Sequence, residues 1–114
     1  MPESSVRFIG WDNVRMSVEK LVADSPEPFD PNTVANVGDL LAVCLERTPV
    51  PARVDEGDWS TVSFSWEDFE IEVFGDRLEV YRFYDQRSKI WYEEHRPGAA
   101  FTPKFLAEIA ALAL

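Results

Sequence analysis

The sequence predicts an α+β fold, with two N-terminal helices, an antiparallel meander of three or four strands and a C-terminal helix. Three observations support this prediction. Apolar residues recur with helical spacing over roughly the first 50 residues, they alternate with polar residues between Trp59 and His95, and helical spacing returns near the C-terminus. A small sheet is stable only when one face is buried against helices, so we expect two-layer packing in a single domain, residues 1–114.

Two helices are expected before the strands, each with a starting signal and a proline-rich end. The first begins near Asp12 and Asn13, which are good N-caps, and ends in the segment 25–28, Ser-Pro-Glu-Pro. The second begins at Asp30-Pro31, an N-cap followed by proline at the first helical position, and ends in the segment 48–51, Thr-Pro-Val-Pro. The expected buried residues are Val14, Val18, Leu21 and Val22 in the first helix, and Val34, Val37, Leu40, Leu41, Cys44 and Leu45 in the second.

The segment that follows has the period-two alternation of half-buried strands. Apolar and polar residues alternate over 61–66 and 69–73, and Gly75-Asp76 then supplies a turn. If this turn is a two-residue hairpin loop, the strands on either side of it pair apolar residues with apolar residues, and a slip of one residue would break the match. A second turn over 85–88 leads to a further strand over 89–95. The pairs expected across the first turn are Val73–Leu78, Ile71–Val80 and Phe69–Arg82.

Two further elements complete the prediction. Thr102 and Pro103 provide the N-cap and the first position of a C-terminal helix. Its expected buried residues are Phe105, Leu106, Ile109 and Leu112. Near the other end of the chain, Ser5 to Ile9 are a candidate short strand.

The same hairpin register predicts the composition of the other face of the sheet. Glu72 lies opposite Glu79 and Glu70 lies opposite Tyr81, with Phe83 two residues further along. Like charges directly opposite each other are unfavourable, by up to about 1 kcal/mol. The segment 51–95 also holds twelve acidic and five basic residues, so it carries seven of the ten net negative charges of the chain.

Two interpretations of this acidic face are open. Under the first, the acids serve solubility, and Tyr81 and Phe83 pack beneath a loop or the last helix. Under the second, the acids flank exposed aromatic side chains and form a docking surface for a basic partner. Aromatic residues are enriched at interface centres, and complementary charge accelerates encounter, which is the basis of the second interpretation.

The last strand adds to this face in either of its two registers. A three-residue turn before it would place Trp91 and Glu93 there, whereas a turn of two or four residues would place Ile90, Tyr92 and Glu94 there. At least one more aromatic side chain joins the face in both cases. The candidate binding residues are Glu70, Glu72, Glu79, Tyr81, Phe83 and Trp91.

The charge of the chain excludes two classes of partner. With 21 acidic and 11 basic residues, the formal net charge is −10 at pH 7. Nucleic-acid binding needs clustered Lys and Arg side chains that neutralise phosphates, and docking on anionic lipids needs a similar basic patch. We therefore expect no direct binding to nucleic acid and no association with a membrane.

Side chains that commonly perform catalysis or bind metals are scarce. His95, the only histidine, follows two glutamates at a strand end and is expected to be a solvated surface residue, whereas Cys44, the only cysteine, is expected to be a buried structural thiol. A zinc site needs further Cys or His ligands, and the acidic segment 55–58 has the composition of a solvated turn rather than of a calcium-binding loop. The sequence lacks a glycine-rich phosphate loop and a nucleophile elbow. We predict no cofactor and no enzymatic activity.

A reducing cytoplasm is the expected location. A single cysteine cannot form an internal disulfide, and residues 1–11 lack the apolar run of a secretory signal. The cytoplasm would be that of a bacterium, or that of a host cell if the protein is encoded by a phage.

Three segments carry a resemblance to other proteins: 49–51 (Pro-Val-Pro), 59–66 (Trp-Ser-Thr-Val-Ser-Phe-Ser-Trp) and 69–73 (Phe-Glu-Ile-Glu-Val). In this stretch the chain resembles a loose class of small uncharacterised bacterial and phage-borne proteins, in which a helix leads through a proline-rich bend into a Trp-containing antiparallel meander. The resemblance implies that arrangement of elements. The class has no established activity, so no functional residue is assigned from it.

Together these features predict a small acidic binding protein of the inhibitor, antitoxin, immunity or phage anti-defence type. Its partner would be a protein with a basic surface. The alternative is a structural or assembly protein that forms a homodimer or larger homo-oligomer through the sheet edge or the C-terminal helix. That alternative rests on the run from Phe105 to Leu114, which is apolar on more than one face.

Overall fold

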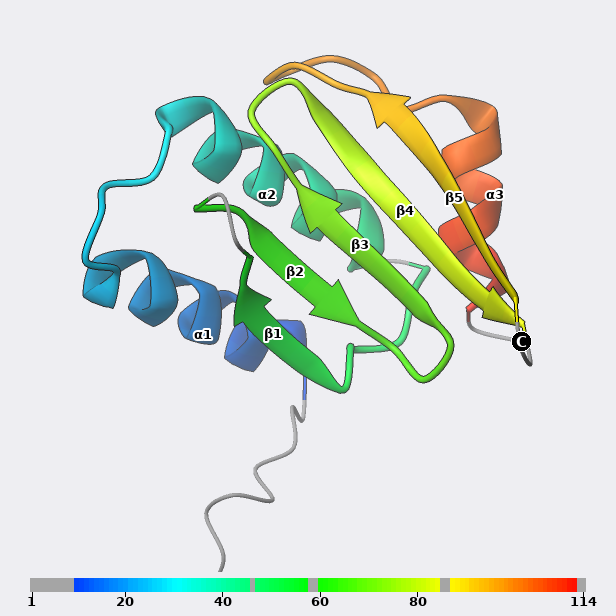
Figure 1. Ribbon diagram of the computed structural model, residues 1–114, viewed down its shortest axis with the longest axis horizontal. Helices are drawn as coiled ribbons and strands as arrows, with labels where there is room; N and C mark the ends of the chain where they lie inside the picture. The colour runs from blue at the N-terminus through cyan, green and yellow to red at the C-terminus, as the bar shows by residue number, and fades with distance from the viewer. Residues whose placement is uncertain (1–9, 46, 58–59, 85–86, 113–114) are drawn as a thin grey trace, which may run out of the picture.

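The computed structural model describes residues 10–45, 47–57, 60–84 and 87–112. Within these ranges the chain forms three helices and a five-stranded antiparallel sheet, in the α+β order that was predicted (Figure 1). The candidate strand at Ser5 to Ile9 lies outside the described residues. The elements are α1 (Trp11–Asp24), α2 (Pro31–Cys44), β1 (Arg53–Glu56), β2 (Val62–Ser65), β3 (Phe69–Val73), β4 (Arg77–Tyr84), β5 (Arg87–Glu94) and α3 (Pro103–Ala111).

All three helices lie against the same face of the sheet, behind it in the view of Figure 1. The expected two-layer packing is therefore confirmed. α1 lies behind β1, and α3 lies behind β5 at the opposite edge (Figure 1). Apolar side chains from both layers form the core between them, because burial of one sheet face against helices removes the most apolar surface from water. The core includes Val14, Val18, Val37, Leu40, Phe64, Phe69, Ile71, Leu78, Val80, Phe105 and Ile109.

Two of the three helices begin at the predicted caps. The Asp30 carboxylate accepts a hydrogen bond from the backbone N–H of Asn32 at 2.8 Å, at the start of α2. The Thr102 hydroxyl oxygen accepts one from the N–H of Phe105 at 3.2 Å, at the start of α3. These contacts satisfy backbone donors that a helix leaves unpaired in its first turn.

The start of α1 differs from the prediction. Its N-cap is Gly10, without a side-chain hydrogen bond to the helix, so neither Asp12 nor Asn13 caps it. The Trp11 indole N–H donates to the backbone carbonyl of Thr48 at 2.9 Å and thereby ties the first turn of α1 to the segment after α2. α1 therefore begins slightly earlier than predicted. Its first turn is held by a contact with a residue far along the chain, and not by a local side-chain cap.

The strands follow one another across the sheet in chain order, as a meander. The predicted register between β3 and β4 is confirmed, with the pairs Val73–Leu78, Ile71–Val80 and Phe69–Arg82. The count of three or four strands was too low, because β1 was not predicted. Three of its four residues are charged, and only Val54 is partly buried, so the period-two signal is weak. Asp55 and Glu56 therefore belong to an edge strand rather than to a solvated turn.

None of the described helices is long and apolar enough to cross a membrane.

Candidate protein-binding face

The face of the sheet opposite the helices is covered by none of the described helices (Figure 1). We call it the open face. Residues directly opposite each other in an antiparallel pair point to the same side, so the strand registers define its members. They are Arg53, Asp55, Ser63, Ser65, Glu70, Glu72, Arg77, Glu79, Tyr81, Phe83, Ser88, Ile90, Tyr92 and Glu94.

Glu72 and Glu79 lie directly opposite each other on this face, as the register predicted, but they have different partners. The Arg77 guanidinium is 3.0 Å from the Glu79 carboxylate, and the Tyr81 hydroxyl donates to the same side chain at 2.7 Å. The Glu72 carboxylate instead accepts a hydrogen bond from the Thr61 hydroxyl, on the β2 side. The expected repulsion is therefore reduced, because Glu79 is paired with a cation and the Glu72 carboxylate is bonded to a different partner.

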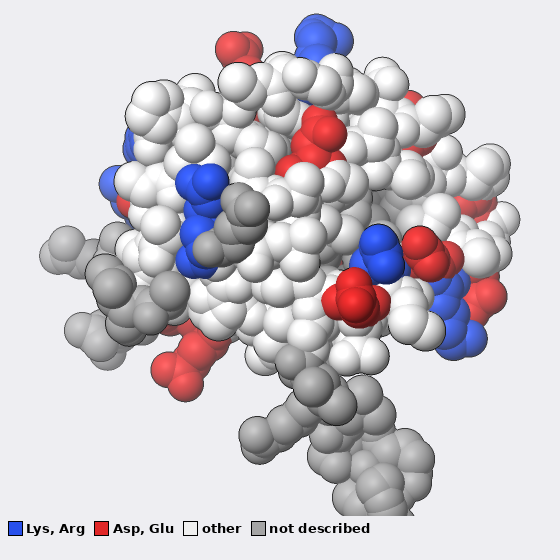
Figure 2. Space-filling model, turned by 180° about the vertical axis from the view of Figure 1, so that it is seen from behind, with Lys and Arg blue, Asp and Glu red and all other residues white. Residues whose placement is uncertain are grey.

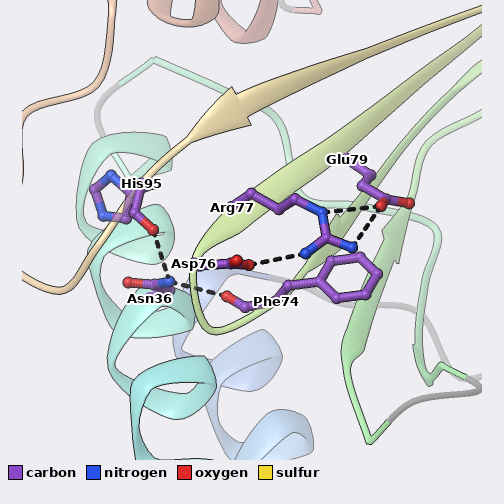
Figure 3. A network of polar contacts seen from close by, with 6 residues as sticks. All are labelled: Asn36, Phe74, Asp76, Arg77, Glu79 and His95. Atoms are coloured by element: carbon purple, nitrogen blue, oxygen red, sulfur yellow. Dashed lines mark hydrogen bonds and ion pairs between the residues drawn. The ribbon is translucent and has the colours of Figure 1, made fainter.

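Arg77 is held in place from three sides (Figure 3). Its guanidinium pairs with Glu79, donates to the Asp76 carboxylate at 2.8 Å and lies 4.0 Å from the centre of the Phe74 ring. Arg77 was not among the residues expected on this face. Its position two residues before Glu79 and four before Tyr81 was sufficient to place it there, because alternate residues of a strand share a face.

Glu70 and Glu72 carry charge that no Lys or Arg among the described residues neutralises by an ion pair. Glu70 accepts a hydrogen bond from the Ser63 hydroxyl at 2.9 Å, so hydroxyl groups orient both carboxylates without cancelling their charge. Burial raises the pKa of Tyr81, and the nearby Glu79, Glu72 and Glu70 raise it further. The Tyr81 phenol is thus held as a neutral hydrogen-bond donor beside three acids.

A zone of exposed apolar side chains borders the acids on β4 and β5. Phe83, Ile90 and Tyr92 are 44%, 53% and 62% exposed, which makes this the main apolar exposure of the described sheet. We call these three residues the apolar zone. Phe83 does not pack beneath a loop or the last helix, which was the expectation under the solubility interpretation. Single exposed apolar residues are ordinary on a protein surface, whereas several on one strand pair are typical of a contact surface.

Trp91 is not part of the open face, which corrects its inclusion among the candidate binding residues. Tyr84 pairs with Arg87, so two residues separate β4 from β5 and the last strand begins earlier than predicted. In this register Trp91 lies opposite Val80, on the helix side. Its ring packs edge-on against Phe105 of α3, with 6.2 Å between the ring centres. Trp91 therefore joins β5 to α3.

The acidity of the open face is lower than the sequence suggested. The face holds five acidic and two basic residues, a net charge of −3, because the other acids of segment 51–95 that the structure describes lie in turns or on the helix side. From the helix side the surface is largely uncharged, with scattered groups of both signs (Figure 2). The distinctive feature of the open face is the combination of unneutralised acids and adjacent apolar side chains.

His95 is buried, at 2% exposure, and is not the solvated residue that was expected. Its Nε2 lies 2.9 Å from the Asp39 carboxylate of α2, and its ring stacks on Phe101 with 4.1 Å between centres. The Asn36 amide donates to the carbonyls of His95 and Phe74, at 3.3 and 2.9 Å (Figure 3). Contacts with α2 thus place the end of β5 in the interior. The two glutamates that precede His95 in the sequence did not indicate this burial.

Cys44 is buried as expected. Burial raises the pKa of its thiol to about 12, so the reactive thiolate is strongly disfavoured. Within the described residues, no group of three or more His, Cys, Asp or Glu side chains is arranged to hold a metal ion.

The structure brings five of the six candidate residues together and adds three that the candidate list lacked. Comparisons of the chain with protein families, with curated proteins and with solved structures each found no match. The open face must therefore be interpreted from its own geometry. Its central residues are Glu70, Glu72, Glu79, Tyr81 and Phe83 from the candidate list, with Arg77, Ile90 and Tyr92 added.

Proposed function

We propose that this protein is a non-enzymatic binding protein that uses the open face to cover a basic surface of another protein. Inhibitors, antitoxins, immunity proteins and phage anti-defence proteins are the functional types that this proposal favours, acting in the cytoplasm of a bacterium or of a phage's host. One observation carries it: two carboxylates without a cationic partner, on β3, share the uncovered face with an exposed apolar zone on β4 and β5.

The two parts of the face would have different roles in binding. Glu70 and Glu72 are already oriented by Ser63 and Thr61, so a Lys or Arg side chain of the partner would meet carboxylates that need little reorganisation. Such charges mainly accelerate encounter and select a basic partner. The apolar zone would supply contact area that loses water on binding and would therefore slow dissociation.

A catalytic role has weaker support. The imidazole of His95 and the thiol of Cys44, the usual candidates for a general base and a nucleophile, are both buried away from the open face. The stacked His95 ring and the raised pKa of Cys44 favour a structural role for each.

The test compares four baits in affinity capture from cells that express the protein, with captured proteins identified by mass spectrometry. The baits are the wild type, Glu70→Gln with Glu72→Gln, Phe83→Ser with Tyr92→Ser, and a control with Glu19→Gln and Glu27→Gln. The control makes the same charge change at two exposed residues outside the sheet. Gln keeps an oxygen that accepts the Ser63 and Thr61 hydrogen bonds, so the first variant changes charge and little else.

We expect a basic protein that the wild type and the control retain and that both open-face variants lose. With the purified partner, the double Gln variant should associate about 3- to 10-fold more slowly at low salt, and this difference should shrink as salt screens the charges. The apolar variant should instead dissociate at least about 10-fold faster. If all four baits retain the same proteins to the same extent, the open face is not the binding surface and the proposal is wrong.

A further inference from the structure

Strand β5 forms one edge of the sheet and pairs only with β4 among the described strands. The N–H of His95 donates to the carbonyl of Asp76, which identifies these two residues as a hydrogen-bonded pair. Because hydrogen-bonded and non-hydrogen-bonded pairs alternate along an antiparallel ladder, Ile90 and Tyr92 belong to non-hydrogen-bonded pairs. Their backbone N–H and C=O groups therefore point away from β4, toward the free edge. An edge of this kind is a template for another strand.

The two edges of the sheet differ in length and charge. The other edge, β1, has four residues, of which three are charged. β5 has eight residues, with two basic side chains, Arg87 and Lys89, and two acidic ones, Glu93 and Glu94. β5 thus has a formal net charge of zero, unlike the chain as a whole.

The sequence of β5 is complementary to itself in one antiparallel register. With Trp91 opposite Trp91 of a second copy, Ile90 lies opposite Tyr92 and Lys89 lies opposite Glu93, each pair occurring twice. This register joins exposed apolar residues to each other, while the buried Glu93 carboxylate keeps its hydrogen bonds to Thr102. It also pairs Ile90 with Tyr92, whose backbone groups both point outward.

The neighbouring registers join fewer exposed apolar residues. With Ile90 at the centre, Lys89 would lie opposite Trp91 and Ser88 opposite Tyr92. With Tyr92 at the centre, the apolar Ile90 would lie opposite the charged Glu94. Each of them keeps only one pair of exposed apolar residues, Ile90 with Ile90 or Tyr92 with Tyr92, whereas the Trp91-centred register makes two such pairs.

Helix α3 lies behind and beside β5 at this edge (Figure 1). Beyond its first turn, its exposed residues are Ala107, Ala110 and Ala111. A second copy would therefore meet small side chains along most of α3 and, at its first turn, Lys104, whose ammonium lies 4.4 Å from the centre of the Trp91 ring.

We propose that two copies of this chain pair antiparallel through β5, with Trp91 on the two-fold axis, so that one sheet runs through both copies. Because residues opposite each other share a side, the two open faces would lie on the same side of that sheet, and the two apolar zones would meet at its centre. The dimer rests on the free edge and the sequence of β5, and it is independent of the existence of a basic partner.

The first test is the mass of the purified chain in solution, measured by sedimentation over a range of concentrations. We expect about twice the 13.0 kDa of one chain at the higher concentrations. Ile90→Pro removes an outward N–H without breaking the pairing with β4, so this variant should be monomeric with an unchanged circular dichroism spectrum. Ile90→Thr is the matched control, because it shortens the same side chain but keeps the N–H, and it should still dimerise.

The register is tested with single cysteine variants under oxidising conditions, since native Cys44 is buried. A symmetric disulfide forms only at the residue on the two-fold axis, so Trp91→Cys should cross-link and Ile90→Cys and Tyr92→Cys should not. If Trp91→Cys does not fold, cross-linking at either of the other two positions still overturns the register. A monomeric wild type, or a dimer that Ile90→Pro leaves intact, overturns the proposal itself.

Discussion

At the scale of single residues, Asn36 has the most consequential position among the polar side chains of the interior. Its amide nitrogen donates to the carbonyl that follows β3 and to the carbonyl at the end of β5, while its backbone belongs to α2 (Figure 3). The two acceptors determine the orientation of the amide, because an oxygen in the nitrogen's place would face two carbonyl oxygens. One side chain thus connects a helix to two strands.

The substitution Asn36→Asp should therefore destabilise the fold strongly. A carboxylate oxygen in place of the amide nitrogen would lose two donated hydrogen bonds and place a buried charge against two acceptors. We expect the free energy of unfolding to fall by about 2–4 kcal/mol, against about 1–3 kcal/mol for Asn36→Leu, which removes the bonds without adding charge. Urea denaturation followed by tryptophan fluorescence measures both values.

The matched control is Asn13→Asp, the same chemical change at an exposed position in the first turn of α1. It should change stability by no more than about 0.5 kcal/mol. If Asn36→Asp is as mild as this control, the amide does not hold the two carbonyls as described.

His95 shows why the candidate residues could be only partly assigned from sequence. Two preceding glutamates suggested a solvated position, because local composition is the only guide when the fold is unknown. The ring is buried by Asp39 and Phe101, and Asp39 lies 56 residues away along the chain. A contact over that separation leaves no local signal.

At the scale of elements, α3 is attached to the sheet through its own N-cap. The buried Glu93 carboxylate of β5 accepts hydrogen bonds from the Thr102 backbone N–H at 2.7 Å and from the Thr102 hydroxyl at 2.8 Å. The same hydroxyl oxygen accepts from the N–H of Phe105. Thr102 thus caps α3 and satisfies a buried carboxylate at the same time.

Removal of this hydroxyl should affect both functions. We expect Thr102→Ala to lower the free energy of unfolding by about 1–3 kcal/mol, since a lost cap and a poorly satisfied buried carboxylate both contribute. Chemical denaturation measures the change. Thr102→Ser keeps the hydroxyl and should stay within about 0.5 kcal/mol of the wild type. A Ser variant as unstable as the Ala variant would show that the methyl group, not the hydroxyl, matters.

The elements were predicted well where the signal was local. Asp30 and Thr102 act as the caps that were expected, and the Gly75-Asp76 turn determines the β3–β4 register because the two strands are adjacent in the chain. The register of β5 depended on the length of a turn without a clear sequence signal. That length decided whether Trp91 or Tyr92 joins the open face.

At the scale of the whole molecule, the helices are on one side of the sheet (Figure 1), and the strand registers place Glu70 and Glu72, which form no ion pair among the described residues, on the other side. Three of the seven described ion pairs join two exposed side chains, and each of these three contributes little to stability. The net charge of −10 is therefore expected to act mainly as repulsion across the surface.

This charge balance predicts that moderate salt stabilises the fold. Raising NaCl from about 10 mM to about 200 mM shortens the screening length from about 30 Å to less than 10 Å, which weakens repulsion between distant acids. We expect the midpoint of thermal unfolding to rise by a few degrees over this range, measured by calorimetry at neutral pH. A parallel series at constant salt with an uncharged osmolyte separates screening from general solute effects. A midpoint that falls with salt would mean that attractive ion pairs outweigh the repulsion.

The sequence by itself determined the order of the elements, the caps of α2 and α3, and the β3–β4 register that places Glu70, Glu72, Glu79, Tyr81 and Phe83 on one face. These features follow from periodicity and short-range contacts, which the chain encodes locally. The tertiary structure alone decided the side on which Trp91 lies, the burial of His95, and which acids keep an unneutralised charge. Those outcomes depend on turn length and on partners far apart along the chain, whose proximity exists only once the helices have packed against the sheet.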